Sequence, residues 1–222
     1  KADFKLNTEE EGIIWVQKVE DPRPFGVVKI NEQGYITDFV EKPVEFVSDL
    51  AIIGIYYFKD GENLRKELQY LIDNNILDKG EFQITNALEN MKEKGVKIKP
   101  GEVSEWLDCG NYKVTVNTNQ RYLSYLEERG EKLQSDSAKV KNCVIIPPVL
   151  ISDNAKISNS VIGPYVSIGK GTEINNSRIR NTIIQNDSKL DEANIADSMI
   201  GNSVEINDSS RNYSLGDFSK IE

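Results

Sequence analysis

The second half of the chain carries a spacing of aliphatic residues that few folds can satisfy. Isoleucine or leucine recurs every five or six residues, and three such steps make a period of 16 or 17 residues. This spacing matches neither the 3.6-residue period of an α-helix nor the two-residue alternation of a hairpin sheet. The twelve positions are Ile145, Ile151, Ile157, Ile162, Ile168, Ile174, Ile179, Ile184, Leu190, Ile195, Ile200 and Ile206.

Such spacing is typical of the hexapeptide repeat of a parallel β-helix. Each short strand would point one aliphatic side chain inward, and Asn, Asp, Gly and Ser would occupy corners with left-handed or nearly left-handed backbone. An irregular Ile/Asn/Ser-rich segment is the alternative, but it would not keep the spacing over twelve positions. We predict four stacked coils within a domain of residues 140–222, and the resemblance to hexapeptide-repeat proteins implies a left-handed coil.

The first part of the chain alternates apolar strands with amphipathic helices, which predicts an α/β domain. The apolar run 52–58 indicates a strand covered on both faces in the middle of a sheet. A polar segment, 134–139, marks the boundary, so the first domain is expected over residues 1–135. Strands are expected over 13–16, 26–30, 35–40 and 96–98, with a hairpin turn at 31–34. Helices are expected over 62–76, with Leu64, Leu68, Leu71 and Ile72 buried, over 83–94, and around 122–126.

Composition removes several classes of function. The net charge of −9 and the pI near 4.8 disfavour a binder of nucleic acid or of an anionic membrane surface. No run of about 18 apolar residues is present, so no membrane-spanning segment is expected. Cys109 and Cys143 lie far apart, which suits free thiols in the cytoplasm. Histidine is absent, so any chemistry rests on carboxylates, Lys, Arg or a metal held by oxygen.

Two short motifs in the first part suit the binding of an anionic ligand. Gly26 follows a proline-stiffened turn at the start of a strand, where a glycine lets a ligand approach the backbone; a plain loop into a strand is the alternative. Glu41 and Lys42 precede Pro43, which favours extended backbone at Lys42. The pair supplies an acceptor for sugar hydroxyls and a cation for a phosphate, or else forms an ordinary solvated surface.

A third motif, Trp106-Leu107-Asp108-Cys109-Gly110-Asn111, places a carboxylate between an apolar dipeptide and a glycine turn. Asp108 is suited to a hard cation such as Mg²⁺, which prefers oxygen ligands and keeps several waters. An Asx turn, in which the aspartate satisfies its own loop, explains the same residues equally well.

Taken in order, these motifs resemble the sugar-1-phosphate nucleotidyltransferase family, most closely the glucose-1-phosphate thymidylyltransferase type with a C-terminal β-helix. The matching segments are Phe25–Val28, Glu41–Pro43, Ala51–Tyr56, Gly80–Ala87 and Trp106–Gly110. The resemblance implies transfer of a nucleotidyl group from a nucleoside triphosphate to a sugar-1-phosphate, with Mg²⁺, in the cytoplasm. It also implies homo-oligomers.

The same resemblance assigns roles to individual residues. The backbone of Gly26 and Ile52 would contact the sugar, Glu41 would accept from its hydroxyls, and Lys42 would hold its phosphate. Asp108 would be one Mg²⁺ ligand, and Glu81 would help to frame the sugar pocket.

The chain departs from the family pattern in its first residues. The family's Gly-rich loop with an Arg, its Lys-Pro motif and an aspartate expected just before the segment of Phe4 as second Mg²⁺ ligand are absent. The only G-x-G is Gly169-Lys170-Gly171. We therefore expect this sequence to correspond to the sugar-phosphate half of the enzyme plus the β-helix, and to be inactive on its own. An N-terminal half that is encoded separately, detached by proteolysis or deleted would each explain the departure.

Two other functions remain open. Many hexapeptide-repeat proteins are acyltransferases, but these usually use a His base, which this chain lacks. The other alternative is a non-catalytic regulatory or scaffolding subunit that keeps the sugar-binding half of the site and oligomerises through its β-helix.

Overall fold

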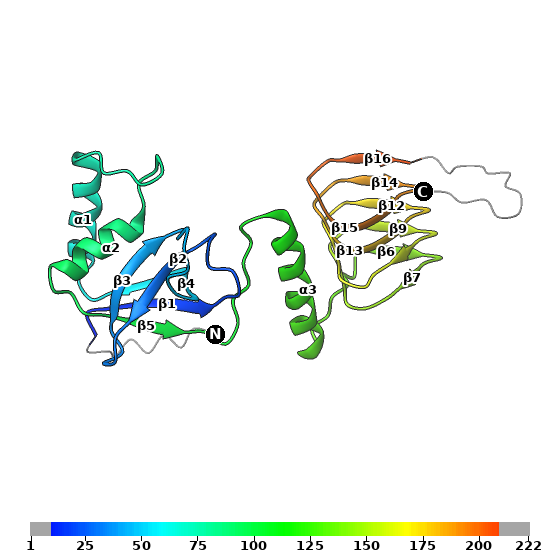
Figure 1. Cartoon of the computed structure of the whole chain (residues 1–222). Helices are drawn as coiled ribbons and strands as arrows, with labels where there is room; N and C mark the ends of the chain where they lie inside the picture. Colours follow the sequence, from blue (N-terminus) through cyan, green and yellow to red (C-terminus); the bar gives the residue numbers. More distant parts are fainter. Residues whose placement is uncertain (1–9, 209–222) are drawn as a thin grey trace, which may run out of the picture. The chain divides into compact units, whose positions relative to one another are not determined.

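The computed structural model describes residues 10–208, which pack as two compact units (Figure 1). One unit ends at Trp106 and the other begins at Leu107. Helix α3 (Tyr112–Glu128) belongs to the second unit and packs against strands of that unit. A packing unit need not coincide with a domain, so the limits 1–135 and 140–222 stay a prediction.

The first unit is built on a mixed five-stranded sheet in the order β3-β2-β4-β1-β5. Its pairs are antiparallel except β1 with β5, and β4 lies in the middle as predicted. The predicted hairpin is confirmed: β2 and β3 join through a turn in which Asn31 Oδ1 accepts from the amides of Gln33 and Tyr35. The strands are β1 (Gly12–Lys18), β2 (Gly26–Ile30), β3 (Ile36–Glu41), β4 (Leu50–Phe58) and β5 (Ile98–Glu102).

Two strand predictions need correction. Ala51 is the one fully buried residue of β4 and Gly54 is exposed, so this strand is not covered on both faces. The last strand was expected over 96–98 but runs from Ile98 to Glu102. Its pairing with β1 extends it through Pro100 and Gly101, two residues that local propensity excludes from strands.

Helices α1 (Gly61–Asp73) and α2 (Ile84–Glu93) pack against each other, and α2 also packs on β3. The expected buried stripe of α1 is partly wrong, because Leu71 is buried but Ile72 is 55% exposed. Glu67 takes the buried place instead, with Lys94 Nζ at 2.6 and 2.7 Å from its two carboxylate oxygens. Glu67 precedes Leu71 by four residues and therefore shares its face, whereas Ile72 is turned about 100° away.

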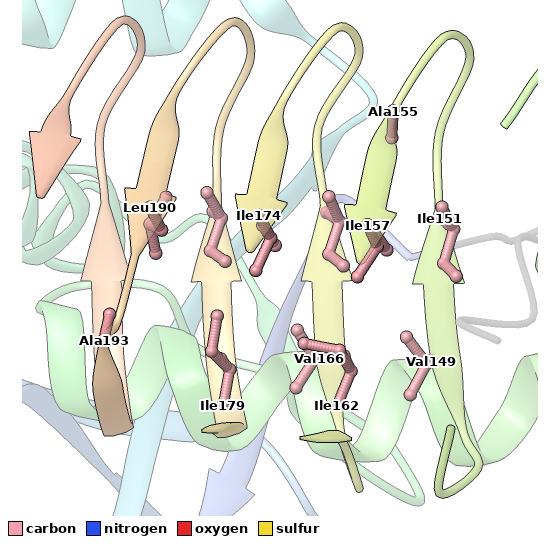
Figure 2. Packing of buried hydrophobic residues seen from close by; sticks show 12 residues of the cluster. Val149, Ile151, Ala155, Ile157, Ile162, Val166, Ile174, Ile179, Leu190 and Ala193 are labelled. Atoms are coloured by element: carbon pink, nitrogen blue, oxygen red, sulfur yellow. The ribbon is translucent and has the colours of Figure 1, made fainter. Parts of the chain in front are cut away.

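The second unit contains the predicted parallel β-helix. Its strands stack in parallel, and the periodic residues lie in register, for example Ile151 with Ile168 and Ile168 with Ile184. The inward side chains form the ladders seen in Figure 2. The strands are β6 (Lys139–Lys141), β7 (Val144–Ile145), β8 (Val149–Ile151), β9 (Lys156–Ser158), β10 (Val161–Ile162), β11 (Val166–Ile168), β12 (Glu173–Asn175), β13 (Arg178–Ile184), β14 (Lys189–Asp191), β15 (Asn194–Ile200) and β16 (Glu205–Asn207).

The corners of the coils confirm the expected left-handed backbone. Positive φ occurs there mostly at short polar residues, namely Asn142, Asn154, Asn159, Asn176, Asn181, Asp187, Asp197 and Ser203, and also at Tyr165 and Glu192. Buried hydroxyls link successive coils, because the amides of Ser177 and Ala193 donate to the Oγ atoms of Ser160 and Ser177 at 3.0 Å. These two backbone amides are therefore satisfied within the stack.

Candidate functional site

The predicted sugar-side residues of the first unit come together where β2 and β3 pair. Gly26 lies directly opposite Glu41, and Val27 pairs with Ala51, which brings Ile52 of β4 beside them. A Cβ atom on Gly26 would lie 2.9 Å from Glu41 Oε2 and 3.5 Å from Ile52 Cδ1. A side chain at position 26 would therefore force the Glu41 carboxylate to shift from its place.

The Glu41 side chain is only 12% exposed, yet it carries a carboxylate. Thr85, a buried residue of α2, donates its hydroxyl to Glu41 Oε2 at 3.3 Å. Burial raises the pKa of Tyr56 above its ordinary value of 10.0, and the charge of Glu41 is the smaller cause. Thr85 therefore fixes one carboxylate oxygen, and Glu41 keeps further acceptor capacity for a ligand.

Lys42 differs from the sequence-based expectation. Its φ is +42°, so its backbone is left-handed rather than extended. Tertiary bonds override the preference imposed by Pro43, since the Lys42 amide donates to the Phe25 carbonyl at 3.0 Å. The ammonium stands 4.0 Å from Glu41 Oε1 and the side chain is 47% exposed. A half-exposed cation beside a largely buried carboxylate is suited to an anionic ligand that also carries hydroxyl groups.

Sequence reasoning missed Lys79, which holds the Lys42 turn. Asp78 and Glu81 exchange backbone hydrogen bonds and form a tight turn with Lys79 at its tip. Lys79 Nζ donates to the carbonyl of Lys42 at 2.8 Å and to that of Glu41 at 3.3 Å. A Lys-Gly pair between two acidic residues signals a turn, but nothing local indicates where its ammonium goes.

Glu81 lies in the same turn as Lys79 and is exposed. Its Oε2 accepts from Gln83 Nε2 at 3.2 Å, and no hydrogen bond to the Glu41 group is present among the described bonds of its carboxylate. Its predicted part in framing a sugar pocket therefore stays a prediction.

Aromatic packing closes one end of this group. The rings of Phe25 and Trp106 meet edge to face, with centroids 5.1 Å apart and planes at 67°. Trp106 is thus held beside the residue that precedes Gly26, and the first unit ends there.

Asp108 belongs to the second unit and forms the Asx turn that the sequence left open as an alternative. Its Oδ1 accepts from the Gly110 amide at 3.0 Å, and its carbonyl accepts from the Thr118 hydroxyl at 2.5 Å. Asn111 caps α3, because its Oδ1 accepts from the amides of Lys113 and Val114. Asn is among the residues preferred at an N-cap, which gives Asn111 a structural role at the start of α3.

The carboxylate of Asp108 fits Mg²⁺ as one ligand but not as a complete site. A carboxylate that has accepted one hydrogen bond keeps lone pairs for a cation. Mg²⁺ commonly takes one or two carboxylates and completes its shell with waters and substrate phosphates. Within residues 10–208, no group of three or more His, Cys, Asp or Glu side chains is arranged to hold a metal ion. The second ligand expected near Phe4 lies outside the described residues.

The fold and these residues define a class of protein, and comparison with known proteins identifies it. Residues 2–124 match the nucleotidyl transferase family, and the chain belongs to that family. None of the helices between residues 10 and 208 is long and apolar enough to cross a membrane.

Among curated relatives, the chain is similar to glucose-1-phosphate thymidylyltransferase of Streptomyces antibioticus, with 29% identity over 94% of this chain and 63% of that protein. It is 31% identical to the mannose-1-phosphate guanylyltransferase catalytic subunit beta of Drosophila melanogaster, over 68% of this chain and 38% of that protein. It is also 31% identical to the low-salt glycan biosynthesis nucleotidyltransferase Agl11 of Haloferax volcanii, over 57% of this chain and 34% of that protein. The chain thus spans less than two thirds of each relative.

Proposed function

We propose that the protein transfers a nucleotidyl group from a nucleoside triphosphate to a sugar-1-phosphate and releases pyrophosphate. The observation that carries the proposal is the Glu41 carboxylate, packed against Gly26, with the Lys42 ammonium 4.0 Å away. Transfer of a thymidylyl group to glucose-1-phosphate is the preferred form. The Streptomyces antibioticus relative of that name supports it, because the similarity extends over 94% of this chain.

In this reaction an oxygen of the sugar phosphate attacks the α-phosphorus of the triphosphate. A new P–O bond forms as the bond to the β-phosphate oxygen breaks, and both bridging electrons leave with pyrophosphate. Several negative charges converge, so the protein contributes mainly positioning and charge neutralisation. Lys42 would hold the sugar phosphate, and Glu41 would accept hydrogen bonds from sugar hydroxyls. The backbone of Gly26 and Ile52 would form the floor beneath the sugar.

Asp108 is proposed as one ligand of Mg²⁺. When bound, the cation would neutralise phosphate charge. The Asx turn and the Thr118 hydrogen bond hold the Asp108 backbone, which keeps the carboxylate at the start of α3. Together these contacts reduce the conformational entropy lost when a cation binds.

The chain is proposed to supply only the sugar-phosphate side of the site. The relatives are longer, and this sequence has no Gly-rich loop with an Arg to hold the triphosphate. The residues that bind and select the nucleotide would then lie in sequence beyond this chain. Nucleotidyl transfer by these 222 residues alone is not expected.

The test measures pyrophosphate release by the complete protein with Mg²⁺, glucose-1-phosphate and each nucleoside triphosphate in turn. Removal of a charge-assisted hydrogen bond costs about 1.5–3 kcal/mol, so Lys42→Ala should lower kcat/KM by about 10- to 100-fold. Asp108→Asn should lower it at least as much, whereas Lys29→Ala, which removes an exposed lysine of β2, should leave it unchanged. If the first two variants stay within about threefold of wild type, the assigned roles are wrong.

We further propose that the protein forms homo-oligomers through its β-helix and acts in the cytoplasm. Exposed aliphatic side chains on neighbouring coils, Val144, Ile146 and Val161, support the first point. The free thiols of Cys109 and Cys143 support the second. Light scattering measures the molecular mass of the wild type and of Val144→Lys. If the wild type is a monomer, the oligomer is excluded. If the wild type is an oligomer and Val144→Lys has the same mass, this face is not the interface.

A further inference from the structure

A cavity of about 300 Å³ lies within the second unit, between the first turns of α3 and one corner of the β-helix. Its walls are Tyr112, Lys113, Val116 and Asn117 of α3 together with Asn181 and Asp197. Five of these six side chains can donate or accept a hydrogen bond. The volume is at the lower end of the range for ligand pockets and suits a molecule the size of a monosaccharide.

The two corner residues lie one above the other on successive coils. Thr182 pairs with Ser198, so Asn181 and Asp197 occupy equivalent places, and both have positive φ. The coil before them carries Tyr165 at the same place, since Val166 pairs with Thr182. This corner thus carries the large Tyr165 on one coil and the short polar residues Asn181 and Asp197, which border the cavity, on the next two coils.

Asn181 carries an acceptor with no partner. Its side chain is nine-tenths buried, and its Nδ2 donates to Asp197 Oδ1 at 2.6 Å. Its Oδ1 is buried and has no hydrogen bond partner. The left-handed backbone explains why an Asn stands at this position, but it does not explain a buried carbonyl oxygen without a donor. A hydroxyl donor in the adjoining cavity would satisfy it.

The charges around the cavity favour a neutral ligand. Asp197 presents a carboxylate that would repel an anion, and its Oδ2 is 3.7 Å from Arg180 Nη2. The Lys113 ammonium supplies a donor and lies 5.9 Å from the centre of the Tyr112 ring. Tyr112 is 55% exposed, so part of its side chain is accessible to a ligand in the cavity.

From this arrangement we propose that the cavity binds a neutral polyhydroxylated ligand, the class to which free sugars belong. Hydroxyl groups both donate and accept, which matches Asn181 Oδ1 and Asp197 as acceptors and Lys113 and Asn117 as donors. The apolar C–H face of a sugar ring would pack on Tyr112. All the residues that line the cavity belong to the second unit, whereas Glu41 belongs to the first, and the proposal does not depend on the nucleotidyl transfer proposed for the Glu41 group.

The experiment is saturation-transfer NMR on the full chain with millimolar D-glucose as the probe. A ligand of this size binds with a Kd on the order of 1 mM. Tyr112→Ala and Asn181→Gly should each weaken binding by about tenfold or more. Glycine at 181 tolerates the positive φ, and circular dichroism checks that each variant is folded. Tyr122→Ala removes another exposed tyrosine of α3 and serves as the matched control with unchanged binding.

Loss of the glucose signal in the first two variants but not in the control supports the site. The proposal is overturned if glucose gives no signal, or if inorganic phosphate or glycine binds here and glucose does not. It is also overturned if binding survives Tyr112→Ala and Asn181→Gly but is lost in Glu41→Gln, since glucose would then occupy the first unit.

Discussion

The tight packing around Gly26 gives the sharpest test of the site. Substitution by alanine adds one methyl group 2.9 Å from Glu41 Oε2, 3.1 Å from Thr85 Cγ2 and 3.5 Å from Ile52 Cδ1. Ordinary contact begins at 3.4 Å, so the carboxylate has to retreat by roughly half an ångström. Gly26 does not have a positive φ, and alanine therefore causes no backbone strain of its own.

Two terms set the size of the effect. Overpacking of a filled site costs about 1–3 kcal/mol. Replacing glycine by alanine in a compatible conformation raises the free energy of unfolding by about 0.4–1 kcal/mol, because the unfolded chain has less conformational entropy. The net loss of unfolding free energy in the first unit of Gly26→Ala should therefore be at most about 2.6 kcal/mol, and the variant should be about 1–3 kcal/mol less stable than a variant in which only the gain applies. Gly61→Ala is the matched control: it has no atom within 4 Å of the added methyl, so only the gain applies.

Urea unfolding followed by tryptophan fluorescence measures this difference. The two tryptophans of the chain, Trp15 and Trp106, both lie in the first unit, so the signal reports that unit alone. In the complete protein, displacement of Glu41 should also raise KM for the sugar-1-phosphate by about tenfold, the effect of weakening one charge-assisted hydrogen bond. A Gly26→Ala variant as stable as Gly61→Ala would refute the packing argument, and an unchanged KM would refute the role of Glu41.

Three further predictions concern neighbouring contacts and the β-helix. Thr85→Val removes the donor to the partly buried Glu41 oxygen and should lower the free energy of unfolding in urea by about 0.5–1.5 kcal/mol, the net contribution of one hydrogen bond, whereas Thr85→Ser should recover most of it. Ile168 is 1% exposed in a central coil, so Ile168→Ala should lower the free energy of unfolding by about 2–5 kcal/mol. Ile206 is partly buried in the last coil, so Ile206→Ala should lower it less, and thermal melts followed by circular dichroism compare the two variants. Because the pKa of Tyr56 is raised in the folded state, the unfolded chain loses this proton first, and the free energy of unfolding should fall as pH rises above about 10. Urea titrations at a series of pH values measure this decrease, and Tyr56→Phe should remove the part of it that is due to Tyr56.

The β-helix was predictable because one local rule repeats in every coil. An inward aliphatic residue recurs every five or six positions, and no competing structure satisfies that spacing, so even the register of Ile168 with Ile184 follows from counting. The hairpin of β2 and β3 was predictable for a similar reason, since a turn sequence stands between two short apolar runs.

The buried face of α1 was harder to predict because a charged residue occupies it. Hydrophobic periodicity assigned Ile72 to the core and did not indicate a buried Glu67. The structure buries Glu67 because Lys94, 27 residues further along the chain, neutralises it. A long-range ion pair of this kind leaves no local signal, since Glu and Lys are ordinary residues of an exposed helix.

The conformation of the site depends on similar long-range contacts. Glu41 and Lys42 were recognised from their order beside Pro43, but the left-handed turn at Lys42 was not. The Phe25 carbonyl and the Lys79 ammonium fix that turn, and together they outweigh the local preference of a residue before proline. The sequence therefore showed which two residues could bind a ligand, but it did not show the backbone geometry that orients their side chains.

The alignment of Glu41 with Gly26 finally depends on a single irregularity in the hairpin. Ile30 pairs with Ile36, and regular pairing from there would set Val40 opposite Gly26. The register instead shifts by one residue at Thr37, whose carbonyl accepts from Lys92 Nζ at 3.0 Å. Successive residues of a strand face opposite sides of a sheet, so without this bulge the glycine would meet an aliphatic side chain and the carboxylate would move out of register. A structural bulge at one end of β3 thus determines which side chain reaches the candidate site at the other end.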